Sequence, residues 1–553
     1  DRDESGLWFR YHPLMRDALL HRLRHSGEID IRQLHDRASG WVASQQLWAE
    51  AIRHALAAGK SAAKDAEAGA QSLAEEGDID TLVQWIRYLP ANPDPSRIAL
   101  QLNLAWALAH RFRFSEARQL LDAIEMQSAA HGEALAHSAW VKLRVVRAIC
   151  EAFADNIDRS IAIVEPLLRE VPCGDIWVDG LVCNILSYCH LADSRPQQAL
   201  EVQQRVSGVS LANRNLFVTV YRAFVMAQSY LRQGNLAEAE RQAARALRYA
   251  ERHAGENASS GATLAPILAE IAWEQGKGEQ AQSLLVPRLE TIDSFCPPDG
   301  LSRSYIVLAR QARETGRLAE AESLLLHAEG LAAQRGWLRA QAPLLAERIA
   351  VALHAGDKQA AEALLLRLQS LSQTESVGGY IAIGQSRLLI AAGEPLAAAR
   401  LLDTLAGVRE SSGERLFAVR LRLRQALALW RAGERELAMA ICRPALARAL
   451  HQGLWRSLLE GREEMAALLA EIHKRGAADD ALTADIAVLL SRFAAAGIVI
   501  DSARQQPLAL RLTEREQQTL SLIADGYSNK GVARELGISA ETVKWHLKQL
   551  YEK

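Results

Sequence analysis

Apolar and polar residues alternate at helical spacing along most of the chain, and between residues 92 and 452 the pattern itself repeats. Six segments share a glycine, a short polar stretch, an alanine five residues after the glycine, and an apolar continuation. The glycines are Gly234, Gly276, Gly316, Gly356, Gly393 and Gly433, and the alanines are Ala239, Ala281, Ala321, Ala361, Ala398 and Ala438. Successive glycines lie 42, 40, 40, 37 and 40 residues apart, so the period is close to 40 residues.

A period of this length predicts an array of helical hairpins. Two helices of about 15 residues and two turns account for it. The glycine ends the first helix of each pair, and the alanine lets the second helix pack closely against the first. One hairpin cannot bury its own apolar face, so successive hairpins stack into a superhelix. Three earlier copies lack the glycine but keep a small residue at Ala117, Ser160 and Ala199.

Composition supports an all-α fold. Hydrophobic residues make up 49% of the chain and aromatic residues only 6%, and the abundance of Ala and Leu favours helices over strands. We expect four tryptophans inside helical segments to be buried: Trp106, Trp140, Trp273 and Trp430.

The start of the chain predicts a helical unit with a short extended entry. Pro13 suits the first turn of a helix, and a second helical segment is predicted from about residue 31 to 58. Gly59-Lys60-Ser61 resembles the end of a phosphate-binding loop, but His54 stands where that motif requires a glycine. Helical spacing before it would also tie up the backbone amides that cradle a phosphate. We therefore predict no cofactor site within this chain.

Nothing in the sequence favours an enzyme, a metal site or a membrane protein. No metalloprotease or serine-hydrolase motif occurs, and the 15 histidines are scattered. The six cysteines show no C-x-x-C spacing, which is typical of reduced thiols in a cytosol. No apolar run approaches the roughly 18 residues of a membrane span, and no secretory leader is visible. The expectation is a cytoplasmic protein that is not an enzyme.

Residues 512–551 predict three short helices in succession. Thr513 and Glu516 form a capping box for the first helix, whose apolar positions are Leu520, Ile523 and Ala524, and Gly526 ends it. Ser528 or Asn529 can cap the second helix. Gly537 makes a tight turn, and Ser539 caps the third helix. Two helices joined by a short turn containing glycine predict a helix-turn-helix, whose second helix enters the major groove of DNA.

The third helix has two faces. Val543, Leu547 and Leu550 form a core stripe, while Lys544, Trp545 and Lys548 lie on the other side. An ordinary helical hairpin with a solvated charged face is the alternative. Residues 508–553 hold seven Lys or Arg and six Asp or Glu, and the whole chain has a net charge of −2. Phosphate attraction by one such domain is therefore expected to be weak.

The C-terminal segment resembles the LuxR/NarL-type DNA-binding domain. The residues that carry the resemblance are Thr513, Arg515, Glu516, Gly526, Ser528-Asn529-Lys530, Ala533, Leu536, Ser539, Thr542-Val543-Lys544 and His546. It implies base contacts for Lys544, Trp545 and Lys548. It implies phosphate or capping roles for Asn529, Lys530, Ser539, Thr542 and His546. Gly531 and Trp545 depart from the family, which usually has an acidic residue at the first position and a smaller residue at the second.

The start of the chain resembles the end of the winged-helix module of MalT-type regulators, and the repeats resemble the long TPR-like solenoid of that group. The first resemblance is carried by Tyr11-His12-Pro13-Leu14, Arg16-Asp17, Leu34-His35, Ala38-Ser39, Trp41 and Glu50-Ala51-Ile52. In that family an ATP-binding NTPase domain precedes this module, and a further helix follows the recognition helix. We expect both ends of this sequence to be cuts, with ATP as a ligand only of the missing domain.

These observations predict four regions. Residues 1–90 are the end of a winged-helix module and a helical arm, and residues 91–475 are the TPR-like solenoid. Residues 476–507 are a helix and linker, and residues 508–553 are a truncated LuxR-type helix-turn-helix domain.

The resemblance implies a bacterial, signal-responsive transcriptional activator. Its expected partners are double-stranded promoter DNA, RNA polymerase, a small-molecule inducer or regulatory protein on the solenoid, and other copies of the full-length protein. The alternative is a TPR-like scaffold for protein partners with secondary DNA binding.

Overall fold

The structure is a computed structural model. It describes residues 13–25, 30–45, 47–59, 63–85, 98–131, 135–205, 215–255, 259–371, 375–459, 461–475, 480–495, 514–524 and 527–552. Every regular element in these ranges is a helix, which confirms the predicted all-α class.

The N-terminal arm holds five helices: α1 (Pro13–His25), α2 (Ile31–Ser44), α3 (Trp48–Ala57), α4 (Ala63–Glu76) and α5 (Ile79–Trp85). Pro13 begins α1 as predicted. The single segment predicted from 31 to 58 is wrong, because two helices occupy it. The backbone N–H of Gln45 donates to the carbonyls of Ala43 and Val42 and thereby closes α2.

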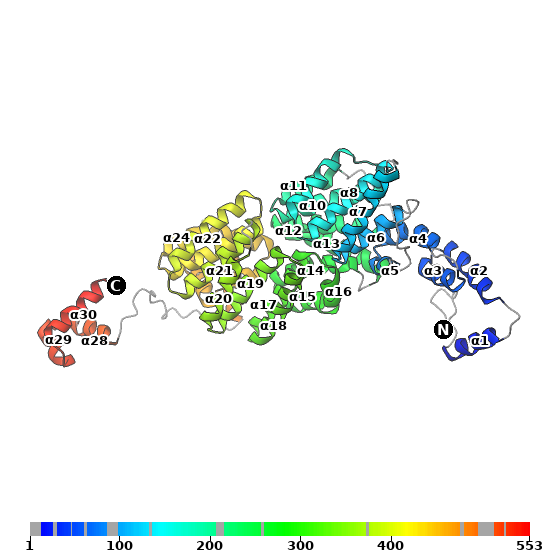
Figure 1. Cartoon of the computed structure of the whole chain (residues 1–553). Helices are drawn as coiled ribbons and strands as arrows, with labels where there is room; N and C mark the ends of the chain where they lie inside the picture. Colours follow the sequence, from blue (N-terminus) through cyan, green and yellow to red (C-terminus); the bar gives the residue numbers. More distant parts are fainter. Residues whose placement is uncertain are drawn as a thin grey trace.

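Paired helices form the solenoid (Figure 1). The hairpins are α6 (Ile98–His110) with α7 (Phe114–His131), α8 (His137–Phe153) with α9 (Ile157–Val164), α10 (Ile176–Ala192) with α11 (Pro196–Arg205), α12 (Leu216–Arg232) with α13 (Leu236–Ala254), α14 (Ser259–Glu274) with α15 (Gly278–Leu285), α17 (Pro298–Glu314) with α18 (Leu318–Gln334), α19 (Leu338–His354) with α20 (Lys358–Gln369), α21 (Glu375–Ala391) with α22 (Pro395–Ser411), and α23 (Arg415–Arg431) with α24 (Arg435–Gln452). The short helices η3 (Glu165–Arg169), η4 (Val286–Arg288) and α16 (Leu289–Phe295) extend two of these hairpins. After α24 come α25 (Trp455–Leu459), α26 (Arg462–Lys474) and α27 (Asp480–Ala495).

The predicted glycine and alanine register is confirmed. The six repeat glycines have φ angles between 76° and 84°, the left-handed conformation that ends a helix at low cost only for glycine. The six repeat alanines are completely buried. Each alanine therefore lies on the buried face of the second helix of its hairpin.

The three earlier copies make the same turn without glycine. Phe112, Asp155 and Ser194 lie five residues before the small residue of each copy, and their φ angles are 59°, 68° and 58°. This conformation is unfavourable for residues with a side chain. Each side chain makes a distant contact: the ring of Phe112 packs on Trp337, Asp155 binds Arg339, and Ser194 binds Arg409.

Other hydrogen bonds also join hairpins that are far apart in the chain. The backbone N–H of Arg339 donates to Asp155 at 2.9 Å, Arg232 donates to Glu414 at 2.8 Å, and the N–H of Ser457 donates to Glu274 at 3.1 Å. The paired residues are 184, 182 and 183 positions apart. At a repeat length near 40 residues, each of these three bonds spans roughly four and a half hairpins.

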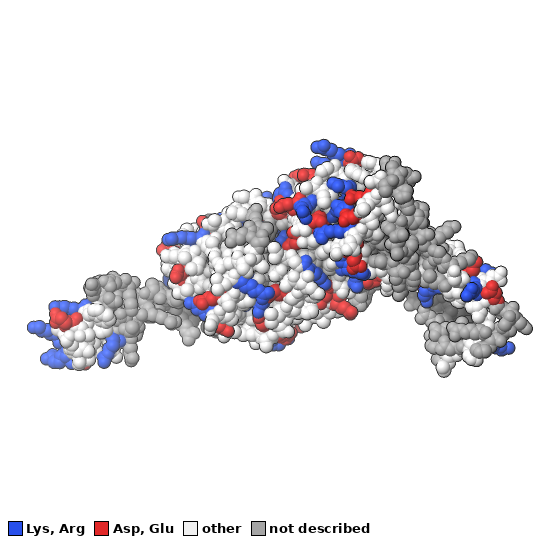
Figure 2. Space-filling view, in the orientation of Figure 1, with Lys and Arg blue, Asp and Glu red and all other residues white. Residues whose placement is uncertain are grey.

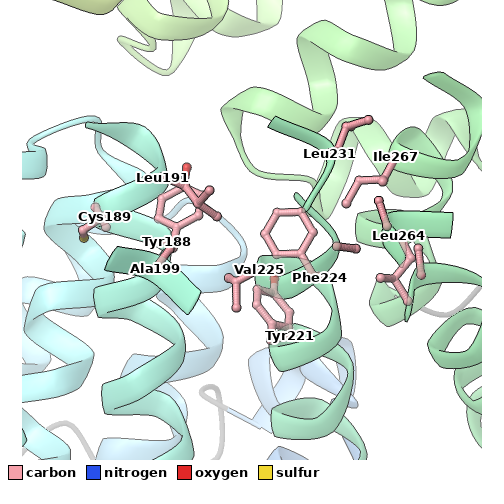
Figure 3. Packing of buried hydrophobic residues seen from close by; sticks show 14 of the residues in the cluster. Tyr188, Cys189, Leu191, Ala199, Tyr221, Phe224, Val225, Leu231, Leu264 and Ile267 are labelled. Carbon is pink, nitrogen blue, oxygen red and sulfur yellow. The ribbon is translucent and has the colours of Figure 1, made fainter. Parts of the chain in front are cut away.

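The core runs continuously between hairpins. Figure 3 shows side chains of α10, α12 and α14 packing in sequence, among them Tyr188, Phe224 and Leu264, all of them buried. Of the tryptophans, Trp106 and Trp273 are buried and Trp430 is partly buried against the core. The prediction for Trp140 is wrong, since it is 41% exposed and stacks on His137 in the first turn of α8.

Replacing Ala321 by leucine should destabilise the solenoid. Its Cβ lies in a completely buried position of α18, so the added atoms must displace neighbouring helices at a cost of about 1–3 kcal/mol. Chemical denaturation measures the free energy of unfolding. Ala319→Leu on the exposed side of the same helix is the matched control. Equal stability of the two variants would contradict the stacked-hairpin packing.

Candidate nucleic-acid interface and charged cavity

The C-terminal helices are α28 (Glu514–Ala524), α29 (Asn529–Leu536) and α30 (Ala540–Glu552). Val532, Ala533 and Val543 form the small core between them. Leu522, Ile523 and Leu547 pack against it, among other partly buried residues. Ala533 of α29 and Val543 of α30, which the sequence places in a core stripe, thus lie in one buried cluster.

Local hydrogen bonds explain why the helices begin and end where they do. The Oγ of Ser528 accepts from the N–H of Gly531 at 3.3 Å, so Ser528 is the cap of α29 and Asn529 its first residue. Gly537 has a φ of 64° and ends α29. The Oγ of Ser539 accepts from the N–H of Thr542 at 3.1 Å at the start of α30. Thr513, Gly526 and the side chain of Glu516 lie outside the described residues.

The buried face of α28 differs from the prediction. Leu520 is 45% exposed, while Thr519 is completely buried and its hydroxyl donates to the carbonyl of Arg515 at 2.7 Å. This bond satisfies the hydroxyl inside the helix, so a threonine can occupy a core position that hydrophobicity alone gives to leucine. The side chain of Ala524 lies outside the described residues.

The predicted contact residues gather on α30 and the start of α29. The side chains of Lys530, Ser539, Lys544 and Trp545 are exposed, and those of Asn529, Thr542 and His546 are half-buried. Lys544, Trp545 and His546 are consecutive, and the rings of Trp545 and His546 lie 5.0 Å apart. The side chain of Lys548 lies outside the described residues.

The charge of this surface is modest, as the sequence suggested. Lys544 donates to Glu541 one turn earlier at 3.0 Å, and both side chains are mostly exposed. An exposed pair of this kind contributes about 0–1 kcal/mol, so Lys544 can leave it for another anion. Figure 2 shows basic side chains beside acidic ones on the visible face of the described part of this domain.

A second site lies on the solenoid, where a ligand or partner is expected, but the sequence did not predict which residues line it. A cavity of about 780 Å³ is bounded by α14, α17, α19, α21, α22, α23, α25 and α26. Eight arginines and four glutamates line it, although acidic residues slightly outnumber basic ones in the whole chain. One sequence pattern could have indicated this cluster of arginines, since Arg420, Arg424 and Arg431 recur at i, i+4 and i+11 and therefore lie on one side of α23.

One buried carboxylate organises the wall of this cavity. Glu347 accepts from Arg310 at 3.0 Å and from Arg313 at 2.8 Å, and Arg387 lies 3.5 Å away. Burial opposes the charged carboxylate, but attraction by the three arginines outweighs it and holds the pKa of Glu347 well below its ordinary value. All three arginines also line the cavity.

A smaller cavity of about 210 Å³ adjoins the first, and Arg310, Arg387, Arg420 and Arg424 line both. Here Asp299 accepts from Arg232 at 3.2 Å and from Arg339 at 3.3 Å. The inner surface thus carries a continuous set of buried charges.

Other kinds of site are not visible in the described part of the chain. No group of three or more histidine, cysteine or carboxylate side chains there could hold a metal ion. None of its helices is long and apolar enough to cross a membrane. The six cysteines are free, and burial raises the pKa of Cys150 and Cys442 to about 12, so these two stay protonated and unreactive.

Comparison with family models gives two matches. Residues 141–475 match the MalT-like TPR region, and residues 510–553 match the luxR family of bacterial regulatory proteins. One curated relative is the HTH-type transcriptional regulator MalT of Klebsiella pneumoniae (strain 342), with 23% identity. The alignment covers 100% of this chain and 63% of that protein, so this chain spans less than two thirds of its relative.

Two solved structures are similar to this chain at low identity. A Rap protein complexed with Competence and Sporulation Factor superposes with a TM-score of 0.50 at 12% identity, covering 65% of this chain and 100% of that one. A human IFIT1 dimer with m7Gppp-AAAA has a TM-score of 0.37 at 14% identity, covering 85% and 96%. The first likeness supports the fold of the repeats.

Glu270 offers a test of the buried charges. Burial opposes its charged form, but Arg420 and Arg303 lower its pKa to about 2, below the ordinary 4.5. A depressed carboxyl pKa contributes stability that is present above pH 4.5 and is lost as the pH falls toward 2. Glu270→Gln should therefore lower the free energy of unfolding by about 3 kcal/mol near neutral pH.

The difference between Glu270→Gln and the natural chain should shrink as the pH falls below 4.5, as measured by urea denaturation at several pH values. Glu320→Gln, whose carboxylate lies in a half-exposed pair with Arg317, is the matched control and should change little. A Glu270→Gln effect that stays constant with pH would contradict the charge assignment.

Proposed function

The chain belongs to the family of proteins with a MalT-like TPR region and carries a luxR-type helix-turn-helix, and on this premise we propose that it is a signal-responsive transcriptional activator. It acts in the bacterial cytoplasm. The observation that carries the proposal is the exposed face of α30, which follows the capped turn of a helix-turn-helix. That helix is the one that enters the major groove in this motif.

The contacts of α30 with DNA fall into two kinds. Lys544, Trp545 and Lys548 are proposed to read base edges, because a lysine can donate to the acceptors of guanine and an apolar ring can contact the methyl group of thymine. Asn529, Lys530, Ser539, Thr542 and His546 are proposed to hold phosphates or to support the helix. In support, the hydroxyl of Ser539 already caps α30, where a phosphate would meet free backbone amides.

The solenoid is proposed to sense the signal. Its inner surface holds a cavity large enough for a small molecule, and α25 and α26 at its edge precede the DNA-binding domain in the sequence. A small-molecule inducer or a regulatory protein is the proposed partner there. RNA polymerase and other copies of the protein are proposed partners at the promoter.

The four regions 1–90, 91–475, 476–507 and 508–553 are proposed as the working units of the chain. The resemblance implies that ATP binds an NTPase domain, and we propose no ATP site within this sequence. A TPR-like scaffold for proteins, with DNA binding secondary, remains the second candidate because repeat solenoids present extended binding surfaces.

Lys544→Ala should relax sequence preference. Duplexes are first selected from a random pool by the natural chain, and affinity is then measured by fluorescence anisotropy on the selected sequence and its single-base variants. Loss of a base contact should cost about 1–3 kcal/mol on the selected sequence and reduce discrimination at one base pair.

Lys530→Ala should weaken all duplexes alike and lower the salt dependence of binding by about one phosphate contact. Lys358→Ala, which removes an exposed lysine of α20, is the matched control and should change neither quantity. If Lys544→Ala weakens every duplex equally, its proposed base contact is wrong. A pool from which no preferred sequence emerges would favour the scaffold.

A further inference from the structure

We propose that the larger cavity of the solenoid binds a small organic anion carrying two or more carboxylate or phosphate groups. This inference rests on the proposed function and names the chemical class of its signal. The cavity measures about 780 Å³, within the range of roughly 300–1,000 Å³ found for small-molecule sites. Its charge, its unpaired donors and its apolar wall each point to the same kind of ligand.

The first argument is charge. Eight arginines and four glutamates line this cavity, and two further glutamates, Glu270 and Glu347, pair with lining arginines from behind. An excess of two positive charges remains, in a chain whose total is −2. In one wall, three guanidinium groups share the single buried carboxylate of Glu347. Like charges held together in a partly dehydrated cavity repel one another, and a bound anion would relieve that repulsion. Guanidinium groups also match carboxylate and phosphate oxygens in geometry.

The second argument is hydrogen bonding. The Nε atoms of Arg420 and Arg456 are buried and have no hydrogen-bond partner among the described residues, and both side chains line the cavity. A buried N–H of a charged group left without an acceptor is costly. One terminal nitrogen of Arg420 donates to Glu270 and Glu274, and one of Arg456 donates to Glu314, so both side chains are held in place beside the cavity.

The third argument is the shape of the lining. Leu353, Ile390, Leu402 and Leu427 line the cavity beside the arginines, as does Trp273, whose ring lies 4.6 Å below the guanidinium of Arg456. Such a wall suits the carbon body of an organic anion. The ligand would touch α17, α21 and α23 on one side and α25 and α26 on the other, and would hold these elements together.

Calorimetric titration of the whole chain tests the proposal, at about 0.15 M salt so that weak surface attraction is screened. The probes are pyrophosphate, citrate and sucrose. At least one of the two anions should bind with 1:1 stoichiometry and a Kd below about 1 mM, and sucrose should not. Pyrophosphate alone would identify a phosphate ligand, citrate alone a carboxylate ligand, and both would support the shared class.

Two double variants locate the site. Arg431→Gln with Arg462→Gln removes two half-exposed or exposed arginines from the cavity edge and should weaken anion binding about tenfold. Arg422→Gln with Arg475→Gln is the matched control, since these lie on or next to the same two helices, α23 and α26, in ion pairs outside the cavity. The control should retain the natural affinity.

A variant that binds the anion more tightly cannot be explained by misfolding, so one such variant completes the test. Glu463 is exposed, lines the cavity and lies in the first turn of α26. Glu463→Gln removes a repelling charge and should tighten anion binding severalfold. The proposal is overturned if neither anion binds, if sucrose binds equally, or if the cavity and control variants behave alike. Anion binding without sequence-specific DNA binding would sink the proposed function alone, and the reverse result would sink this inference alone.

Discussion

Buried arginines that bind residues several hairpins away fix the register of the solenoid. Repeat proteins ordinarily touch only adjacent repeats, which leaves their pitch free to vary. Here Arg339 binds Asp155 and Arg232 binds Glu414 across roughly four and a half hairpins. Dehydrating such charges offsets much of their attraction, so they add little net stability. Their effect is on register, because a slip by one hairpin would leave each of these charges buried without its partner.

The hairpins themselves could be predicted from the sequence, because their cause is local. Every repeat must end its first helix and pack its second helix closely against the first. A glycine and an alanine five residues later, such as Gly316 and Ala321, meet these two steric requirements. The path of the superhelix could not be predicted, because it depends on contacts such as that of Phe112 with Trp337. Phe112 itself shows the conflict: its local conformation is unfavourable, but its ring packs on the distant side chains of Trp337 and Arg335.

The same division holds in the DNA-binding domain. The turns at Ser528, Gly537 and Ser539 could be predicted from the sequence, because a helix cap needs particular atoms at particular positions. The prediction of the buried face of α28 is partly wrong, because Leu520 is exposed and Thr519 is buried. Thr519 can be buried because its hydroxyl donates a hydrogen bond within the helix. The arginine cavity was missed for a related reason. Arginines scattered over five inner helices look like solvated surface until the superhelix brings them together.

The contacts between the repeats and the helices after the last hairpin could couple ligand binding to a change in conformation. Glu274 binds Arg420 within the repeats and Ser457 of α25, so the same carboxylate joins the inner wall to the helices that follow the last hairpin. A ligand shifts an equilibrium only by the difference in its affinity for two arrangements. An anion touching both the wall and α25–α26 would have such a difference, because moving these helices away would remove Arg456 and Arg462 from it. The charged cavity therefore lies where binding energy can act on the segment that leads to the DNA-binding domain.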